Sequence, residues 1–263
     1  AEWGIDLAEF AVEEVGEADA EPQIDKAAEL NKKWKVKSGD LWQIGEHRLL
    51  CGDSKSEWDV LKFGDIEFCL CLTDPPYGQN QDGVTHDDPE GLHELIELST
   101  AAVPITNGLL VAFQSPRTFP VLLDAVRANG FEFERMLWMY KAAQCTFPWR
   151  GWILKSESIL FASKGEVQWQ DVHPYSHDCY YLPEVSGELS KDAGWHGSVK
   201  PLAVVSDLLA RTSPRGGNVY EPFAGSGTTL VACQNLNRKC YAIEISENYC
   251  AVILERMATA FPD

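Results

Sequence analysis

A carboxylate, two prolines and an aromatic ring form the run whose residue types are best suited to chemistry. Asp74, Pro75, Pro76 and Tyr77 directly follow the apolar run 68–72. In an open parallel sheet, ligands bind beyond the carboxyl ends of the strands, where this order places the carboxylate. An aromatic amino group is a poor nucleophile because its lone pair is delocalised into the ring. A carboxylate and a backbone carbonyl fixed by proline can accept its two hydrogens and free that lone pair.

Tyr77 adds a flat ring on which a base extruded from a helix can stack. The run therefore predicts a site that activates the exocyclic amine of a base. Asp-Pro and Pro-Pro are also common in turns, so a plain turn at the end of a strand is the alternative interpretation.

A glycine-containing loop forms the second candidate site. Its residues are Glu221, Pro222, Phe223, Ala224, Gly225, Ser226, Gly227, Thr228 and Thr229. Gly225 and Gly227 permit the close approach of a ligand, and the helix expected after them offers free amide hydrogens. The Lys of a Walker A sequence and the full dinucleotide spacing of glycines are absent. Glu244 ends an apolar run about 20 residues later, where a carboxylate can bind both hydroxyls of a ribose. An ordinary strand-to-helix turn is the alternative.

A third candidate precedes a helix expected over residues 201–211. His196, Ser198 and Lys200 lie directly before Pro201. A hydroxyl and a proline at a helix start are compatible with capping alone. Beside the other two runs, they also suit an amino-acid carboxylate.

The elements that must position these residues follow an α/β pattern from Gly39 onward, because short apolar runs alternate with amphipathic stretches. Strands are expected at 67–72, 108–113, 133–140, 157–162, 217–221 and 239–244. Helices are expected at 91–103, 117–129, 201–211, 227–236 and 246–259. In the strand at 157–162, Glu157 is interpreted as a sheet-edge contact, with a buried functional acid as the alternative.

Residues 142–194 interrupt this alternation and are rich in Trp, Tyr, His and Pro. Aromatic residues interleaved with Lys and Arg can stack on unpaired bases and contact phosphate. The segment predicts an inserted recognition region, and a buried lid is the alternative.

The net charge of −18 opposes a simple nucleic-acid binder, because phosphate contacts need Lys and Arg. Residues 1–30 hold ten acids against Lys26, so half of the excess lies there. We expect an acidic leader or linker at 1–33 and one domain at 34–263. The eight cysteines include no CxxC pair and no zinc-like spacing, which predicts reduced thiols and no metal. With no apolar run of membrane-spanning length, we expect a cytoplasmic protein.

The three runs, in this order, resemble the DNA amino-methyltransferases of the β class. There the DPPY motif precedes the target-recognition region and the FxGxG motif comes last. The resemblance covers residues 38–259 and implies a circularly permuted, Rossmann-like fold that uses S-adenosylmethionine, with the recognition region inserted at about 142–194. The run 38–54 also resembles members fused to a ParB-like nuclease domain, which implies a phage or mobile-element origin and a missing upstream domain.

The resemblance also implies a role for each matching residue. In the DPPY motif, Asp74 would accept from the target amine, and Tyr77 would stack on the base. The residues expected to hold the cofactor are Asp53 (adenine amine), Asp74, His196, Ser198 and Lys200 (methionyl end), Glu221, Phe223, Ala224, Gly225, Ser226, Gly227 and Thr228 (the loop), and Glu244 (ribose). Glu221 departs from the family, where many members have Asp.

The implied reaction is direct transfer of a methyl group to N6 of adenine in DNA, as in restriction-modification systems. No cysteine is required as a nucleophile. Asp at the first motif position favours adenine, whereas Ser is usual for N4 of cytosine. The alternatives are cytosine N4, an RNA substrate, and a catalytically quiet nucleic-acid-binding module. A homodimer is a further expectation from the family.

Overall fold

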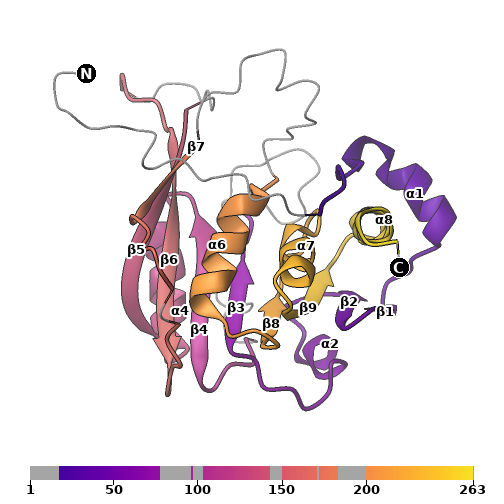
Figure 1. The fold of residues 1–263 in the computed structure, drawn as a ribbon, viewed down its shortest axis with the longest axis horizontal. Helices are drawn as coiled ribbons and strands as arrows, with labels where there is room; N and C mark the ends of the chain where they lie inside the picture. The colour runs from indigo at the N-terminus through magenta and orange to yellow at the C-terminus, as the bar shows by residue number, and fades with distance from the viewer. Residues whose placement is uncertain are drawn as a thin grey trace.

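The computed structural model describes residues 18–77, 96, 103–142, 150–170, 172–182 and 199–262. Within them, a sheet of nine strands has the order β1-β2-β9-β8-β3-β4-β6-β5-β7 (Figure 1). The strands are β1 (Leu41–Ile44), β2 (His47–Cys51), β3 (Leu70–Thr73), β4 (Gly108–Gln114), β5 (Glu132–Lys141), β6 (Ser156–Lys164), β7 (Cys179–Leu182), β8 (Asn218–Glu221) and β9 (Lys239–Glu244). The helices are η2 (Ile24–Lys26), α1 (Ala27–Trp34), α2 (Glu57–Leu61), α4 (Phe119–Ala128), α6 (Leu202–Thr212), α7 (Thr228–Asn235) and α8 (Glu247–Ala260).

The direction of the strands determines where the loops meet. β2, β9, β8, β3 and β4 are parallel to one another, and β6 is antiparallel between β4 and β5. The carboxyl ends of the parallel strands therefore share one edge of the sheet, together with the beginning of β6. The chain leaves β8 toward β9 but leaves β3 toward β4, so the strand order reverses between β8 and β3. Such a reversal opens a crevice at the carboxyl ends, which is where α/β sheets bind ligands.

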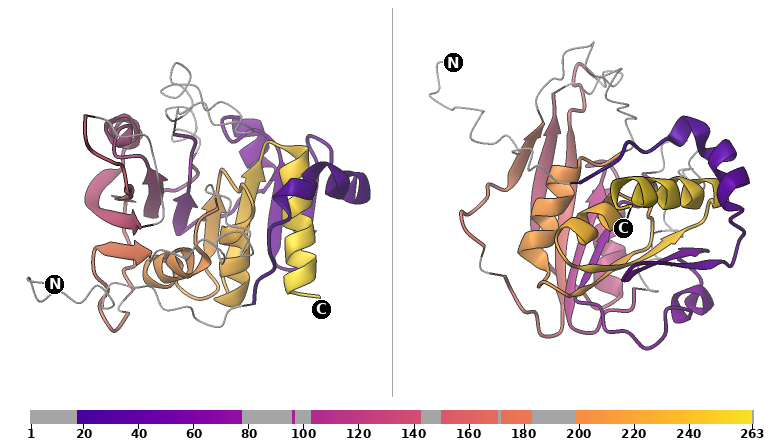
Figure 2. Two further views of the ribbon diagram at one scale, coloured as in Figure 1. Left: turned by 90° about the horizontal axis from the view of Figure 1, so that it is seen from above. Right: turned by 45° about the vertical axis from the view of Figure 1, so that its right-hand side comes forward.

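Helices cover both faces of the sheet, and this explains the apolar central strands. In Figure 1, α6, α7 and α8 lie in front of the sheet and α4 lies behind it, an arrangement that Figure 2 shows from two further directions. Val205 of α6 and Ile253 of α8 are buried on one face, and Leu122 of α4 is buried on the other. All seven residues of β4 are buried, as expected for a strand covered on both sides.

Two helices at the crevice, α7 and α8, are preceded by residues that favour the start of a helix or a sharp turn before it. Ser246 precedes α8, and its side chain accepts a hydrogen bond from the Tyr249 amide, which satisfies one free donor of the first turn. Gly227 precedes α7 with φ +86°, a left-handed conformation that residues with a side chain rarely adopt. The loop between β8 and α7 can therefore turn sharply at the crevice.

The expected insertion differs from the structure in its extent. Of residues 142–194, those of β6 and β7 are strands of the sheet, and Tyr180 of β7 is buried in the core. Tyr180, which is buried in the edge strand β7, thus contributed to the composition that predicted an insertion. The expected helix at 91–103 lies almost wholly outside the described residues. The sequence did not predict α1, α2, β1, β2 or β7.

The end of the expected leader is docked onto the domain. Leu30 of α1 lies in the core, and α1 packs beside α8 (Figure 1). Asp19 accepts from the guanidinium of Arg256 at 2.7 and 2.8 Å, and the Arg256 side chain is 3% exposed. Arg256 also donates to the Ser226 carbonyl and the Thr228 hydroxyl, which are parts of the glycine-containing loop. Residues 18–33 therefore pack on the domain that was expected to begin at 34.

We predict that Asp19→Asn lowers the free energy of unfolding by about 1–3 kcal/mol, because a buried guanidinium loses its charged partner. Urea denaturation of both proteins measures the difference. Glu21→Gln is the matched control, since it changes a neighbouring acid for which the structure gives no such partner among the described residues. Equal midpoints for Asp19→Asn and the control would contradict this view of the ion pair.

Candidate active site

Asp74 lies at the carboxyl end of β3, at the crevice. The buried residues of β3 end at Thr73, and the prolines that follow prevent the strand from continuing. One carboxylate oxygen of Asp74 accepts from the Tyr77 hydroxyl at 2.7 Å. The side chain is 26% exposed, so Asp74 is buried at its base and open on one side.

Lys200, which lies just before α6 in the chain, contacts Asp74. Its ammonium donates to the second carboxylate oxygen of Asp74 at 2.5 Å. The same nitrogen lies 3.4 Å from Glu157 Oε2 and 5.3 Å from the centre of the Tyr77 ring. Burial lowers the pKa of Lys200, but the two carboxylates outweigh it and the net shift is upward. Lys200 is therefore a buried cation held by two acids.

Glu157 and Lys141 complete a cluster that we call the acid–lysine cluster: Asp74, Tyr77, Lys141, Glu157 and Lys200. Lys141 ends β5 and pairs with Glu157 near the start of antiparallel β6, so both side chains lie at the crevice edge. Burial raises the pKa of Glu157, yet Lys200 and Lys141 outweigh it and the net shift is downward. Burial and the two acids raise the pKa of Tyr77 well above its usual range. The cluster thus holds two cations, two anions and a neutral phenol.

Glu221 stabilises the glycine-containing loop by accepting hydrogen bonds from two of its residues. The Phe223 amide donates to one carboxylate oxygen at 3.0 Å, and the Thr229 hydroxyl donates to the other at 2.9 Å. Burial raises the pKa of Glu221 to about 8, although both donors favour the charged form. Glu221 is 4% exposed and is occupied by its own loop.

Glu244 joins that loop to the end of β9. Its carboxylate accepts from the Gly225 amide at 2.9 Å and from the Ser246 amide at 2.8 Å. Burial raises its pKa to about 7. The Gly52 amide donates to the Glu244 carbonyl, which brings the adjoining Asp53 to the same end of the sheet. The Asp53 carboxylate accepts from the Lys55 amide and is 40% exposed.

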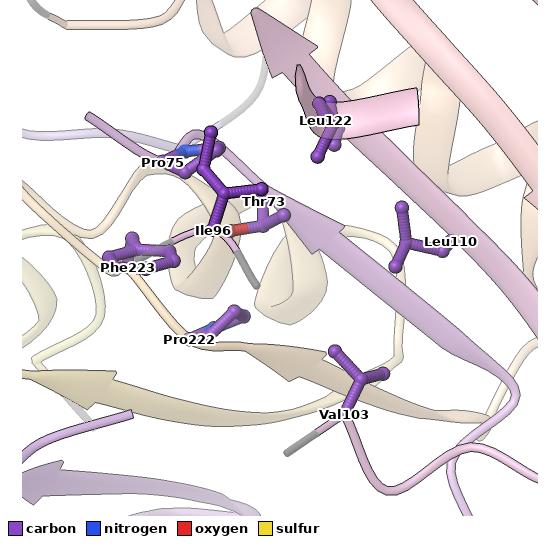
Figure 3. Close-up of a pocket in the computed structure, with 9 residues that line it drawn as sticks. Thr73, Pro75, Ile96, Val103, Leu110, Leu122, Pro222 and Phe223 are labelled. Atoms are coloured by element: carbon purple, nitrogen blue, oxygen red, sulfur yellow. The ribbon is translucent and has the colours of Figure 1, made fainter. Parts of the chain in front are cut away.

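An apolar pocket lies between the two motif-bearing loops. In Figure 3, Pro75 and Phe223 come from different loops and lie near Thr73 and Ile96. Its full lining is Thr73, Pro75, Ile96, Val103, Leu110, Ala112, Leu122, Pro222 and Phe223. A Cβ added at Gly225 would meet nothing within 4 Å, so there is open space above the loop. This pocket is lined mostly by core residues and is too small for a nucleoside, whereas the open space at Gly225 and the carboxylate of Glu244 beside it suit a nucleoside cofactor.

The structure brings together most of the residues that the sequence singled out. Asp74, Tyr77 and Lys200 are in direct contact, and Gly225 contacts Glu244. His196 and Ser198 lie outside the described residues. Ser226, Thr228 and Ala224 are buried.

Sequence reasoning missed Lys141 and gave Glu157 a lesser role. The available signal was a charged residue at one end of each of two expected strands, Lys141 after 133–140 and Glu157 at the start of 157–162, but pairing the two required the β5–β6 register. In that register Glu157 lies opposite Met139, two residues before Lys141. Within the described part of the chain, no group of three His, Cys, Asp or Glu residues is placed to hold a metal ion. In the same ranges, no helix is long and apolar enough to cross a membrane.

The pKa of Glu221 predicts how stability varies with pH. In the unfolded chain this carboxyl, with its usual pKa of 4.5, releases a proton that the folded state keeps. The free energy of unfolding should therefore fall as the pH rises from about 4.5 through 8. Glu221→Gln resembles the protonated form, so the variant should lose less stability over that interval, with Glu244 leaving a residual slope. Urea midpoints at pH 5 and pH 8 measure this. The control is the exposed Glu67→Gln, and a Glu221→Gln profile parallel to the wild type would refute the prediction.

Comparison with known proteins places these features in a family. The type II methyltransferase M.HpaI of Haemophilus parainfluenzae is 23% identical over 249 residues, or 82% of this chain and 76% of that protein. The type II methyltransferase M.SmaI of Serratia marcescens is 44% identical over 64 residues, which span 24% of this chain and only 22% of M.SmaI.

Two solved structures show the same fold. The M1.HpyAVI–SAM complex is 22% identical with a TM-score of 0.61, covering 80% of this chain and 98% of that one. The PvuII DNA methyltransferase, described as cytosine-N4-specific, is 19% identical with a TM-score of 0.61, covering 82% and 86%.

A family model described as DNA methylase matches residues 68–255, a span that contains Asp74, Lys200, the glycine-containing loop and Glu244. The match confirms the prediction of a methyltransferase, and S-adenosylmethionine is the cofactor of this family. This chain is a member of the DNA methylase family.

Proposed function

We propose that the protein transfers a methyl group from S-adenosylmethionine to the exocyclic N6 of adenine in DNA. The observation that carries the proposal is the position of Asp74. Its partly exposed carboxylate lies at the carboxyl end of β3, and the glycine-containing loop follows the neighbouring parallel strand β8. An acceptor for amine hydrogens and a site suited to a nucleoside cofactor thus share one crevice.

The residues around this crevice would hold the cofactor. Phe223 offers an apolar wall, Glu244 can accept from the ribose hydroxyls, and Asp53 can accept from the adenine amine. When bound, S-adenosylmethionine supplies a methyl group attached to a positively charged sulfur. The raised pKa of Glu244 suits this role, since hydroxyl donors favour the charged form of the carboxylate.

The residues of the chain then activate the amine. Asp74 accepts one hydrogen of the amine, and the fixed backbone carbonyl of Pro75 accepts the other, which localises the nitrogen lone pair. Methylation would leave the nitrogen positively charged, and the nitrogen would then pass one proton along its hydrogen bond to the Asp74 carboxylate. The negative Asp74 stabilises that charge as it develops. The Tyr77 ring supplies a stacking surface for the base.

Adenine is favoured over cytosine by Asp at the first position of the motif. Cytosine N4 is the second candidate, because the structurally similar PvuII enzyme is described as cytosine-N4-specific. Both reactions use the same activation of an exocyclic amine, so they differ in the base that fits rather than in the chemistry.

The order of the strands supports a circularly permuted arrangement. β3 bears the catalytic motif and precedes β8, which bears the cofactor loop, and the two are neighbours in the sheet. The recognition region would then lie between β5 and α6, in the parts of residues 142–194 outside β6 and β7. DNA as the partner belongs to this proposal. A homodimer, a ParB-like upstream domain and a cytoplasmic location stay predictions from the sequence.

The first experiment measures transfer of a labelled methyl group from S-adenosylmethionine to unmodified genomic DNA, followed by mass spectrometry of the nucleosides. We expect N6-methyladenine. N4-methylcytosine would keep the mechanism and replace the base. Cofactor binding without a product on DNA would contradict the proposal, and parallel assays on RNA would then separate an RNA substrate from a quiet module.

We also predict that Asp74→Ala lowers the rate of methyl transfer at least about 100-fold, because the amine loses its charged acceptor. Affinity for S-adenosylmethionine, measured by calorimetry, should remain because the residues proposed to hold its nucleoside are unchanged. Asp65→Asn is the control, since Asp65 is exposed and lies before β3. A fully active Asp74→Ala protein would remove Asp74 from the mechanism.

A further inference from the structure

Asp74 is already engaged in this structure, which poses a problem for its proposed role. One of its oxygens accepts from the Tyr77 hydroxyl, and the other accepts a charge-assisted hydrogen bond from Lys200 at 2.5 Å. Such a bond draws electron density from the carboxylate, and bonds of this kind are about twice as strong as neutral ones. A neutral amine is a weak competitor for that oxygen. A carboxylate oxygen can accept more than one hydrogen bond, so the amine can bind beside Lys200, but Asp74 would activate the amine more strongly if the hold of Lys200 weakened when the base arrives.

A second acceptor for Lys200 is within reach. Glu157 Oε2 lies 3.4 Å from the same ammonium and 3.3 Å from the Tyr77 hydroxyl, so both donors to Asp74 also face Glu157. A movement of less than about 1 Å would bring the Lys200–Glu157 distance to that of an ordinary charge-assisted hydrogen bond. Glu157 is 9% exposed in its side chain, whereas Asp74 is 26% exposed. The more accessible of the two acids is thus the one that would receive the substrate.

We infer that Glu157 is a positioning residue that takes over Lys200 and Tyr77 when the target amine binds to Asp74. Lys141 is the second positioning residue, because its buried ammonium pairs with the other oxygen of Glu157 and fixes that carboxylate in place. The inference rests on the proposed function, since it explains how Asp74 becomes a stronger acceptor for the hydrogen of an amine.

Charge balance makes the exchange inexpensive. Lys141 and Lys200 balance Asp74 and Glu157, so the cluster is neutral before and after Lys200 moves. Moving the ammonium from Asp74 to Glu157, each of which has an oxygen within 4 Å of it, avoids the large cost of leaving a buried charge unpaired. Without Glu157, Lys200 would have no second acid to move to, because among the described residues only Asp74 would remain within hydrogen-bond reach of its ammonium.

The test removes the second acid without leaving a buried lysine unpaired. The double variant Lys141→Met/Glu157→Gln deletes one cation and one anion together and retains the Lys200–Asp74 pair. We expect kcat for DNA methylation to fall about 10- to 100-fold at pH 7.5. The Kd for S-adenosylmethionine should stay within about twofold of the wild type. Glu132→Gln, an exposed acid at the start of β5, is the control.

A pH profile separates positioning from a merely structural role. In the double variant the pKa of Lys200 is no longer raised by Glu157, so Lys200 should lose its proton, and with it its hold on Asp74, at a lower pH than in the wild type. The ratio of variant to wild-type kcat should therefore rise with pH. The charge-conserving variant Glu157→Asp should keep a nearly flat ratio, and it provides the test if the double variant does not fold.

Two results would overturn the inference while leaving the proposed function intact. One is a double variant with the wild-type kcat, and the other is a lowered kcat whose ratio to the wild type does not change with pH. If the double variant does not fold and Glu157→Asp is used instead, a ratio of variant to wild-type kcat that rises with pH would overturn the inference. Absence of methylation by the wild-type protein in the same assay would instead mark failure of the proposed function.

Discussion

The burial of Lys200 against Asp74 is the interaction on which the rest of the site depends. An ammonium removed from water is costly unless acids surround it. Here two carboxylates supply that environment and raise its pKa above the usual value despite burial. The first, Asp74, holds the cation at the DPPY motif, and the second, Glu157, balances Lys141. The acid–lysine cluster is therefore neutral, and removing any one of its four charged residues leaves a charge without its balance.

That requirement explains why a mixed sheet serves this chemistry. Asp74 follows β3, Lys141 ends β5, Glu157 opens β6, and Lys200 precedes α6. Because β6 is antiparallel to β4 and β5, its first residues lie at the edge of the sheet where those two strands end. Glu157 therefore meets residues that come from strand ends. On the other side of the reversal in strand order, Glu221 and Glu244 brace the loop that faces the same crevice. One half of the crevice is thus rich in ion pairs, and the other is built from backbone amides that donate to single acids.

Residues at strand ends could be predicted from the sequence, because local order is enough to place them. Asp74 and Glu244 each follow an apolar run, and each lies at a carboxyl end in the structure. The pairing of Lys141 with Glu157 depends on the register of two strands, which no local pattern encodes. The docking of Asp19 on Arg256 joins residues 237 positions apart, so an acidic composition alone indicated a solvated linker. Similarly, the aromatic residues of β7 indicated an insertion because their partners lie in another strand.

The most direct test of the account is a crystal structure of the protein with a non-reactive analogue of S-adenosylmethionine and a DNA duplex that contains its methylation site. The account predicts an extruded base whose amine donates to Asp74, with Lys200 closer to Glu157 than to Asp74. An extruded base whose amine lies away from Asp74, with Lys200 still bound to that carboxylate, would contradict it.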